Sequence, residues 1–328
     1  LQILAFTAAK QFPSAYEKFQ EIKSRVPTEV DADWWRLSWI LAELAFAEEK
    51  FTEAEEIHRI ALSLAADQDS RVKSSIRVAD CLIRQGKDEQ AKYSLQEFRH
   101  NFADRIEYIQ VTLRLAELMS ATKSNLKAAE LFTELAEHPK TEASLRCKAA
   151  IQAADCLERD GQFPDAIAAY RKAAAICAGT AQKAAEALAN AAKIAASTQD
   201  YTLAATIFQE LAEKYPAIEL GKKARFEQAS NLYKATKYEE AVKIFLLFTE
   251  EHSEHKLFWK AKLFAGIAGR LLSTDKKEFL EAAASLLETA RNCGNEELAM
   301  EAYFEAFQAQ MSATAFSEAV ELLQEADK

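Results

Sequence analysis

A carboxylate next to a thiol occurs twice in similar surroundings, which raises the question of a duplicated chemical site. The stretch VADCLIRQGKDEQA contains Asp80 and Cys81, and the related stretch AADCLERDGQFPDA contains Asp155 and Cys156. The positions equivalent to the two cysteines elsewhere in the chain hold Leu44, Leu118, Ile194 and Asn231. Because most of these side chains are apolar and a free cysteine behaves as a small hydrophobic residue, the pattern predicts packing rather than catalysis.

The best arrangement for a metal is a pair of histidines one helical turn apart, His252 and His255, next to Glu251. A protein zinc site takes three or four ligands, and no further ligand accompanies this pair. The other histidines have no cysteine or serine nearby that suggests a nucleophile with its base. They are His58, His100 and His138. The sequence also lacks the GxGxxG, GxxxxGK[ST] and HExxH motifs. We therefore expect no catalytic residue, no metal and no cofactor, and a protein that is not an enzyme.

The composition excludes several classes of protein. The 328 residues are 49% hydrophobic but include 7 Gly and 5 Pro, too few for the many turns of an all-β protein. No apolar run reaches the roughly 18 residues of a membrane span, so no direct membrane insertion is expected. The net charge of −10 would repel nucleic acid, which requires a basic surface. The five cysteines form no CxxC pair and specify neither a disulfide framework nor a zinc site.

An internal repeat accounts for the recurring stretch. Six pairs of alanines stand twelve residues apart, and the pairs recur every 37 or 38 residues. These ladder alanines are residues 42 and 54, 79 and 91, 116 and 128, 154 and 166, 192 and 204, and 229 and 241. Each unit predicts two amphipathic helices that cross closely at the small side chains. A short polar turn joins the helices, and Gly86 and Gly161 mark it as a place for left-handed backbone.

The paired small residues, the aromatic residues around them and the prolines in EKYP and AEHP resemble the tetratricopeptide repeat family. The resemblance covers nearly the whole chain and implies an all-α, right-handed α-α superhelix of about nine helical hairpins in a single domain. HEAT-type repeats rank second, because they lack this paired spacing. The expected units are residues 1–29, 30–68, 69–104, 105–140, 141–179, 180–217, 218–254, 255–294 and 295–328.

A narrower resemblance lies in residues 207–254, where EKYP and KYEEAVKIF are similar to tetratricopeptide repeat proteins of the bacterial cell envelope. These are the Tol–Pal accessory protein and the lipoprotein of the β-barrel assembly machinery. The resemblance favours the bacterial periplasm or envelope as the location. Five unpaired cysteines favour a reducing compartment, so the cytoplasm is the alternative.

In the family, certain positions of the first helix of each hairpin face a concave groove. The resemblance therefore implies a groove with an apolar row between acidic and basic rows, suited to a segment of a partner protein that has an apolar stripe. The expected groove residues are Arg36, Trp39, Glu43, Lys73, Ile76, Asp80, Leu113, Glu117, Lys148, Ile151, Asp155, Lys193, Lys223, Phe226 and Tyr233. The alternative is that the charged rows pair with each other. For the neighbouring Trp34 and Trp35, packing is favoured over an exposed anchor.

These observations predict a non-catalytic scaffold for protein–protein interaction. The narrower resemblance favours a bacterial envelope complex as its setting. The alternatives are a structural spacer or oligomerisation arm of a larger assembly, and a regulatory segment of a longer chain. The first hairpin lacks the start of its first helix, and no polar capping helix follows the last hairpin, so self-association through the ends of the solenoid is a further alternative.

Overall fold

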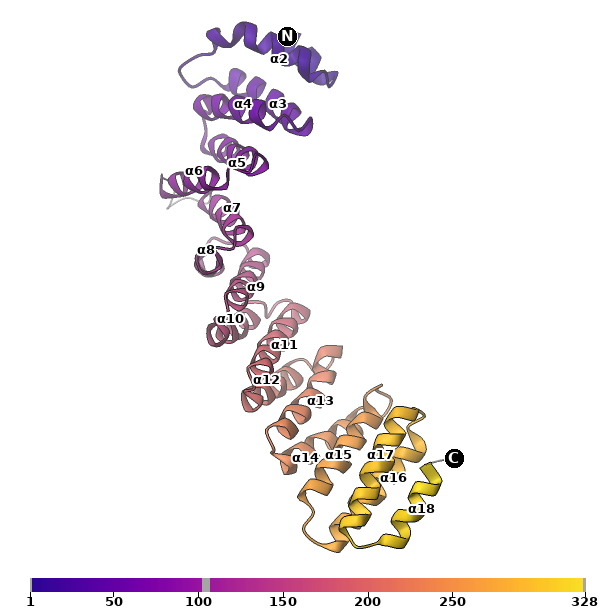
Figure 1. Cartoon of the computed structure of the whole chain (residues 1–328). Helices are drawn as coiled ribbons and strands as arrows, with labels where there is room; N and C mark the ends of the chain where they lie inside the picture. The colour runs from indigo at the N-terminus through magenta and orange to yellow at the C-terminus, as the bar shows by residue number, and fades with distance from the viewer. Residues whose placement is uncertain (1, 102–106, 327–328) are drawn as a thin grey trace. The chain divides into compact units, whose positions relative to one another are not determined.

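The computed structural model describes residues 2–101 and 107–326, and these residues form helices and turns without any strand (Figure 1). The chain divides into two compact units, Leu1–Gly161 and Gln162–Lys328. The all-α class expected from the sequence is therefore confirmed. The predicted boundary between residues 104 and 105 lies outside the described residues, and the division into nine hairpins stays a prediction.

The first unit contains nine α-helices and one short 3-10 helix among its described residues. They are α1 (Gln2–Ala8), α2 (Phe12–Ile22), η1 (Lys23–Arg25), α3 (Ala32–Ala47), α4 (Phe51–Leu64), α5 (Gln68–Arg84), α6 (Asp88–Asn101), α7 (Glu107–Ala121), α8 (Asn125–Glu137) and α9 (Ala143–Arg159). The second unit contains α10 (Phe163–Ile176), α11 (Ala181–Ser197), α12 (Tyr201–Lys214), α13 (Glu219–Lys234), α14 (Tyr238–Glu251), α15 (Phe258–Leu272), α16 (Lys276–Asn292), α17 (Glu296–Ser312) and α18 (Phe316–Ala326). Within each unit, every helix packs on the helix that follows it.

The ladder alanines form the contact points of these helices. All twelve are completely buried, as the sequence predicted. Large side chains such as Leu41 and Leu82 fill the space beside them and are equally buried. Because a helix pair approaches closely only where side chains are small, alanine at these positions lets the larger neighbours interdigitate.

Eight of the turns inside the hairpins share one backbone conformation, which the turn between α15 and α16 does not adopt. A residue with positive φ stands five positions before the second alanine of the hairpin, and it is glycine only at Gly86 and Gly161. At the other described turns of this kind the residue is Lys10, Glu49, Lys123, Gln199, Thr236 or Thr314. The next N–H then bonds to the carbonyl five residues back, as from Lys87 N to Leu82 O at 2.8 Å. This is the Schellman arrangement, which satisfies carbonyls at the end of the first helix.

We expect Gly86→Ala to lower the free energy of unfolding by about 1–2 kcal/mol, because an L side chain is disfavoured at its φ of 73°. A Cβ atom there meets nothing within 4 Å, so the backbone alone accounts for the loss. Gly179→Ala is the matched control, since its Cβ is equally free and its φ is not positive. Urea denaturation of the three chains measures the effect, and equal losses in both variants would contradict the role of the left-handed turn.

Candidate functional site

The predicted groove residues all lie on the helices that open a hairpin. In the first unit, α3 carries Arg36, Trp39 and Glu43, α5 carries Lys73, Ile76 and Asp80, α7 carries Leu113 and Glu117, and α9 carries Lys148, Ile151 and Asp155. In the second unit, α11 carries Lys193, and α13 carries Lys223, Phe226 and Tyr233. We call this set the first-helix face.

The apolar members of this face differ in exposure. Trp39, Ile76, Leu113 and Ile151 are half-buried, so each keeps some surface that a partner can contact. Phe226 is 6% exposed. Its ring packs against three phenylalanines at centroid distances of 5.5, 5.9 and 6.5 Å. These are Phe245, Phe248 and Phe264. Phe226 is thus part of the core of the second unit and offers little surface.

The basic members of the face are exposed. Arg36, Lys73, Lys148, Lys193 and Lys223 all have more than a third of their surface open to solvent. Lys73 and Lys223 form ion pairs with carboxylates on their own helices. Lys73 Nζ lies 2.5 Å from Asp69, and Lys223 Nζ lies 3.3 Å from Glu227. A basic row that is exposed and locally paired can exchange its partners for those of a bound segment at little cost.

Three of the four acidic members of the face, Glu43, Asp80 and Glu117, belong to a chain of ion pairs that sequence inspection missed. The Arg77 guanidinium donates to Glu43 at 2.7 Å and lies 3.6 Å from Asp80. Arg114 donates to Asp80 and lies 3.4 Å from Glu117. We call these five residues the ion ladder. Arg77 and Arg114 stand 37 residues apart, so the repeat period itself is the signal that marks them. The acidic row of the first unit therefore pairs with arginines of its own and neighbouring helices, and these arginines lie outside the predicted basic row.

The tryptophans of α3 are all used in packing within the first unit. Trp34 packs against the buried cluster around Phe19 and Leu41. Trp35 stacks on Trp39 with ring centroids 5.7 Å apart. Trp34 and Trp35 are half-buried, so the interpretation of these two rings as structural is supported.

A buried histidine lies under the ion ladder. The His58 ring is completely buried and meets the edge of Trp39 at a centroid distance of 5.2 Å. Neither of its nitrogens has a hydrogen-bond partner. Burial, together with the Arg77 charge, lowers the pKa of His58 to about 3, although Glu43 Oε1 is 3.6 Å from its Nε2. His58 is therefore neutral at neutral pH and has no nucleophile to activate.

The cysteines of the repeated stretch are buried thiols. Cys81 and Cys156 are free and at most 1% exposed, which confirms the prediction that these two side chains pack in the core. Burial, with the nearby Asp80 and Glu55 carboxylates, raises the pKa of Cys81 to about 12, so the reactive thiolate does not form at neutral pH. Cys293 is free as well. The expectation of five unpaired cysteines is wrong, because Cys147 and Cys177 are disulfide-bonded. The cysteines therefore no longer favour a reducing compartment.

The histidine pair at the end of α14 is also engaged within the protein. The His252 and His255 rings are 6.4 Å apart, and both meet the ring of Phe248. His255 Nε2 lies 3.1 Å from Glu219. In residues 2–101 and 107–326, no three histidine, cysteine or acidic side chains are arranged to hold a metal ion. No helix in the same residues is long and apolar enough to cross a bilayer.

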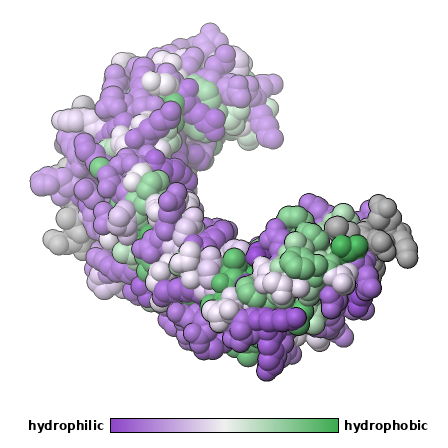
Figure 2. All heavy atoms as spheres, turned by 60° about the horizontal axis from the view of Figure 1, so that its bottom comes forward, coloured by the Kyte–Doolittle hydropathy of each residue, from purple (hydrophilic) through white to green (hydrophobic). Residues whose placement is uncertain are grey.

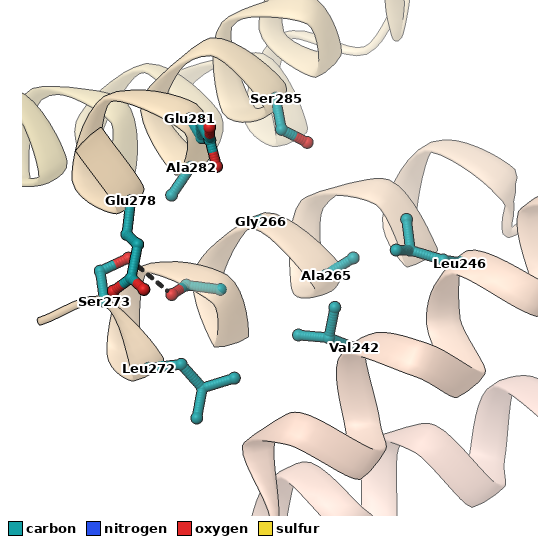
Figure 3. A pocket seen from close by; sticks show the side chains of 11 residues that line it. Val242, Leu246, Ala265, Gly266, Leu272, Ser273, Glu278, Glu281, Ala282 and Ser285 are labelled. Atoms are coloured by element: carbon teal, nitrogen blue, oxygen red, sulfur yellow. Dashed lines mark hydrogen bonds between the residues drawn. The ribbon is translucent and has the colours of Figure 1, made fainter.

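A cavity of about 410 Å³ opens between α14, α15 and α16 (Figure 3). Its lining comprises Val242, Leu246, Ala265, Gly266, Gly269, Leu272, Ser273, Glu278, Glu281, Ala282 and Ser285. Two of its polar side chains serve the helix ends: Glu278 accepts from the N–H of Thr274 at 2.7 Å, and Ser273 donates to the carbonyl of Gly269 at 2.9 Å. No nucleophile–base pair converges on the cavity, so its geometry does not suggest catalysis.

A match to a family model supports the repeat type for two stretches of the chain. A tetratricopeptide repeat family model matches residues 75–104 and 182–217. No curated protein sequence matches the chain. Similar solved structures include apo RapI, which is 15% identical with a TM-score of 0.44, the match covering 95% of this chain and 96% of RapI. The TPR2AB domain of yeast Sti1, in its complex with pHSP90, is 16% identical with a TM-score of 0.40, and the match covers 91% and 100% of the two chains.

A signal transduction ATPase with a tetratricopeptide repeat sensor from Pyrococcus horikoshii is also similar. It is 14% identical with a TM-score of 0.43, and 97% of this chain is covered. The chain spans about half of that protein, at 52% of its length.

Proposed function

Because the chain contains tetratricopeptide repeats, we propose that it is a non-catalytic scaffold that binds a segment of a partner protein along its first-helix face. One observation carries the proposal. In the first unit, Trp39, Ile76 and Leu113 are half-exposed apolar residues, and each precedes an acid of the ion ladder by four residues. An apolar row beside a row of charges matches a segment that has an apolar stripe and charged flanks.

The energetic roles of the two rows differ. Burial of the apolar row against a partner removes hydrophobic surface from water and supplies affinity. The ion ladder supplies selectivity, since its arginines and carboxylates are about one-third exposed or less and lose water when a partner covers them. A partner whose charges oppose the ladder is rejected, because it leaves desolvated groups unpaired. We further propose a bacterial envelope complex as the setting, on the likeness of residues 207–254 alone.

The proposal predicts that Ile76→Asp and Leu113→Asp, made together, weaken binding of the natural partner at least tenfold. A carboxylate in each row position opposes burial of an apolar stripe. Affinity capture from cells, followed by titration of the recovered partner, measures the effect. Leu126→Asp is the matched control, because Leu126 on α8 is 45% exposed and lies outside the face. Recovery of the same partner with equal affinity by the double variant would contradict a role for the first-helix face.

A further inference from the structure

The last helical hairpin has an unusual apolar surface. Five large apolar side chains of α17 and α18 are 40–58% exposed, and they are Met300, Phe304, Met311, Phe316 and Val320. We call this set the end face. Figure 2 shows hydrophobic side chains gathered over this end of the chain. Exposed apolar residues are common singly, but a cluster on one hairpin marks an interaction surface.

The repeat explains what this surface is shaped to receive. Phe304 stands fifteen residues before Ala319, as Phe226 stands fifteen before Ala241. Met311 likewise corresponds to Tyr233, eight residues before the same alanines. In α13 these positions contact Phe264 of α15, which is the first helix of the following hairpin. The ring centroid of Phe264 lies 6.5 Å from that of Phe226 and 5.8 Å from that of Tyr233.

A third position of the end face repeats the same arrangement. Phe316 corresponds to Tyr238, three residues before the second alanine, and the Tyr238 ring lies 5.4 Å from Tyr233. Phe226, Tyr233 and Tyr238 thus form one aromatic surface, and Phe264 packs on two of its rings. The end face repeats this surface with the residues Phe304, Met311 and Phe316, which are exposed where their counterparts are buried or half-buried.

The charge of α17 and α18 indicates the chemistry of a segment that would bind the end face. Helices α17 and α18 contain no lysine, arginine or histidine. Their acids are Glu296, Glu297, Glu301, Glu305, Glu318, Glu321 and Glu325. By contrast, α15 carries Lys260, Lys262 and Arg270 and no acid. Arg270 of α15 pairs with Glu305 of α17 at 2.7 Å, so within the stack a basic side chain of one first helix pairs with an acid of the next first helix.

We propose that the end face binds an amphipathic helix of a partner protein, with an apolar stripe flanked by lysine or arginine. A large apolar side chain of that helix inserts between Phe304 and Met311, in the way that Phe264 packs on α13. Its cationic flanks lie against the glutamates. A second copy of this chain is a weaker candidate, since two chains with a net charge of −10 repel each other.

The probe for this surface is a fluorescent synthetic peptide with the sequence of residues 256–274, which contains all of α15. We expect the full 328-residue chain to bind it saturably in an anisotropy titration. Phe304→Ser combined with Met311→Ser should weaken binding at least tenfold, and a peptide with Phe264→Ala should bind similarly weakly. Leu126→Ser is the control on a distant exposed leucine and should leave affinity unchanged. Because the replaced side chains are exposed, their loss does not threaten folding.

The remaining outcomes separate the alternatives. A peptide with Lys260→Glu and Lys262→Glu should bind more weakly, and higher salt should weaken the original peptide. The proposal is overturned if the acidic peptide binds as tightly as the original peptide. It is also overturned if the original peptide binds the Phe304 and Met311 double variant as tightly as it binds the unchanged chain. A dimer in sedimentation that Phe304→Ser dissolves while the peptide fails to bind would overturn it too, since that result assigns the end face to a second copy. The Ile76 and Leu113 variant should retain peptide binding, which keeps this test separate from the first-helix face.

Discussion

Gly221→Ala is expected to destabilise the second unit by about 3 kcal/mol, the upper part of the usual range for an overpacked site. An added Cβ at Gly221 stands 1.9 Å from the carbonyl oxygen of Tyr215 and 2.7 Å from its carbonyl carbon. The obstacle is backbone, which cannot rotate aside like a side chain. The Gly221 N–H also bonds to Ile218 O at 2.8 Å, so the turn that brings the chain into α13 is held on both sides.

Gly269→Ala is the matched control for this prediction. Gly269 lies in α15, and a Cβ there meets nothing within 4 Å. Alanine is the better helix former, so this variant should gain about 0.5–1 kcal/mol. Urea denaturation followed by circular dichroism measures both. A loss of less than 1 kcal/mol in Gly221→Ala would show that the entry to α13 relaxes easily, and the close approach would then have no energetic meaning.

The repeat architecture was predictable because it depends on small residues at a fixed spacing. Ala79 and Ala91 illustrate this: each is fully buried, and each has an equivalent alanine in the other helical hairpins of the ladder. Gly266 faces the Leu286 side chain, where a Cβ would lie 2.7 Å from Cδ2. Gly269 of the same helix has open space beside it. Two glycines of one helix thus differ because of a neighbour that is distant in sequence.

Other features have no local signal. Lys123 and Thr236 take the left-handed turn conformation without being glycine, because the two helices and the hydrogen bond across the turn fix the backbone there. Phe226 has the pattern of a groove residue and is buried because Phe245 and Phe248 of α14 and Phe264 of the next hairpin surround its ring. The ion ladder joins side chains of different helices, so its pairs follow from how hairpins stack. Sequence therefore predicts the hairpin well and the surface of the stack poorly.

The stability of the first unit is expected to fall steeply between pH 7.5 and pH 4, because of His58. The folded protein holds this ring neutral, with its pKa lowered to about 3 from a usual 6.5. In the unfolded chain the ring takes up a proton as the pH falls below 6.5, whereas in the folded state it does not. Stability is therefore full above pH 6.5 and is lost as the pH falls toward 3. For this shift the loss by pH 4 is about 3 kcal/mol from His58 alone.

His58→Leu removes the titrating group and keeps an apolar side chain in its place. The difference in unfolding free energy between pH 7.5 and pH 4 should then be about 3 kcal/mol smaller than in the original chain, since the carboxylates contribute equally to both. His100→Leu is the control for the loss of an exposed histidine. Urea titrations at the two pH values measure all three chains. An unchanged pH dependence in His58→Leu would mean that the folded state accepts a proton on His58, with Glu43 as the counter-charge 3.6 Å away. The ion ladder would then rearrange on acidification, because Glu43 also accepts from Arg77.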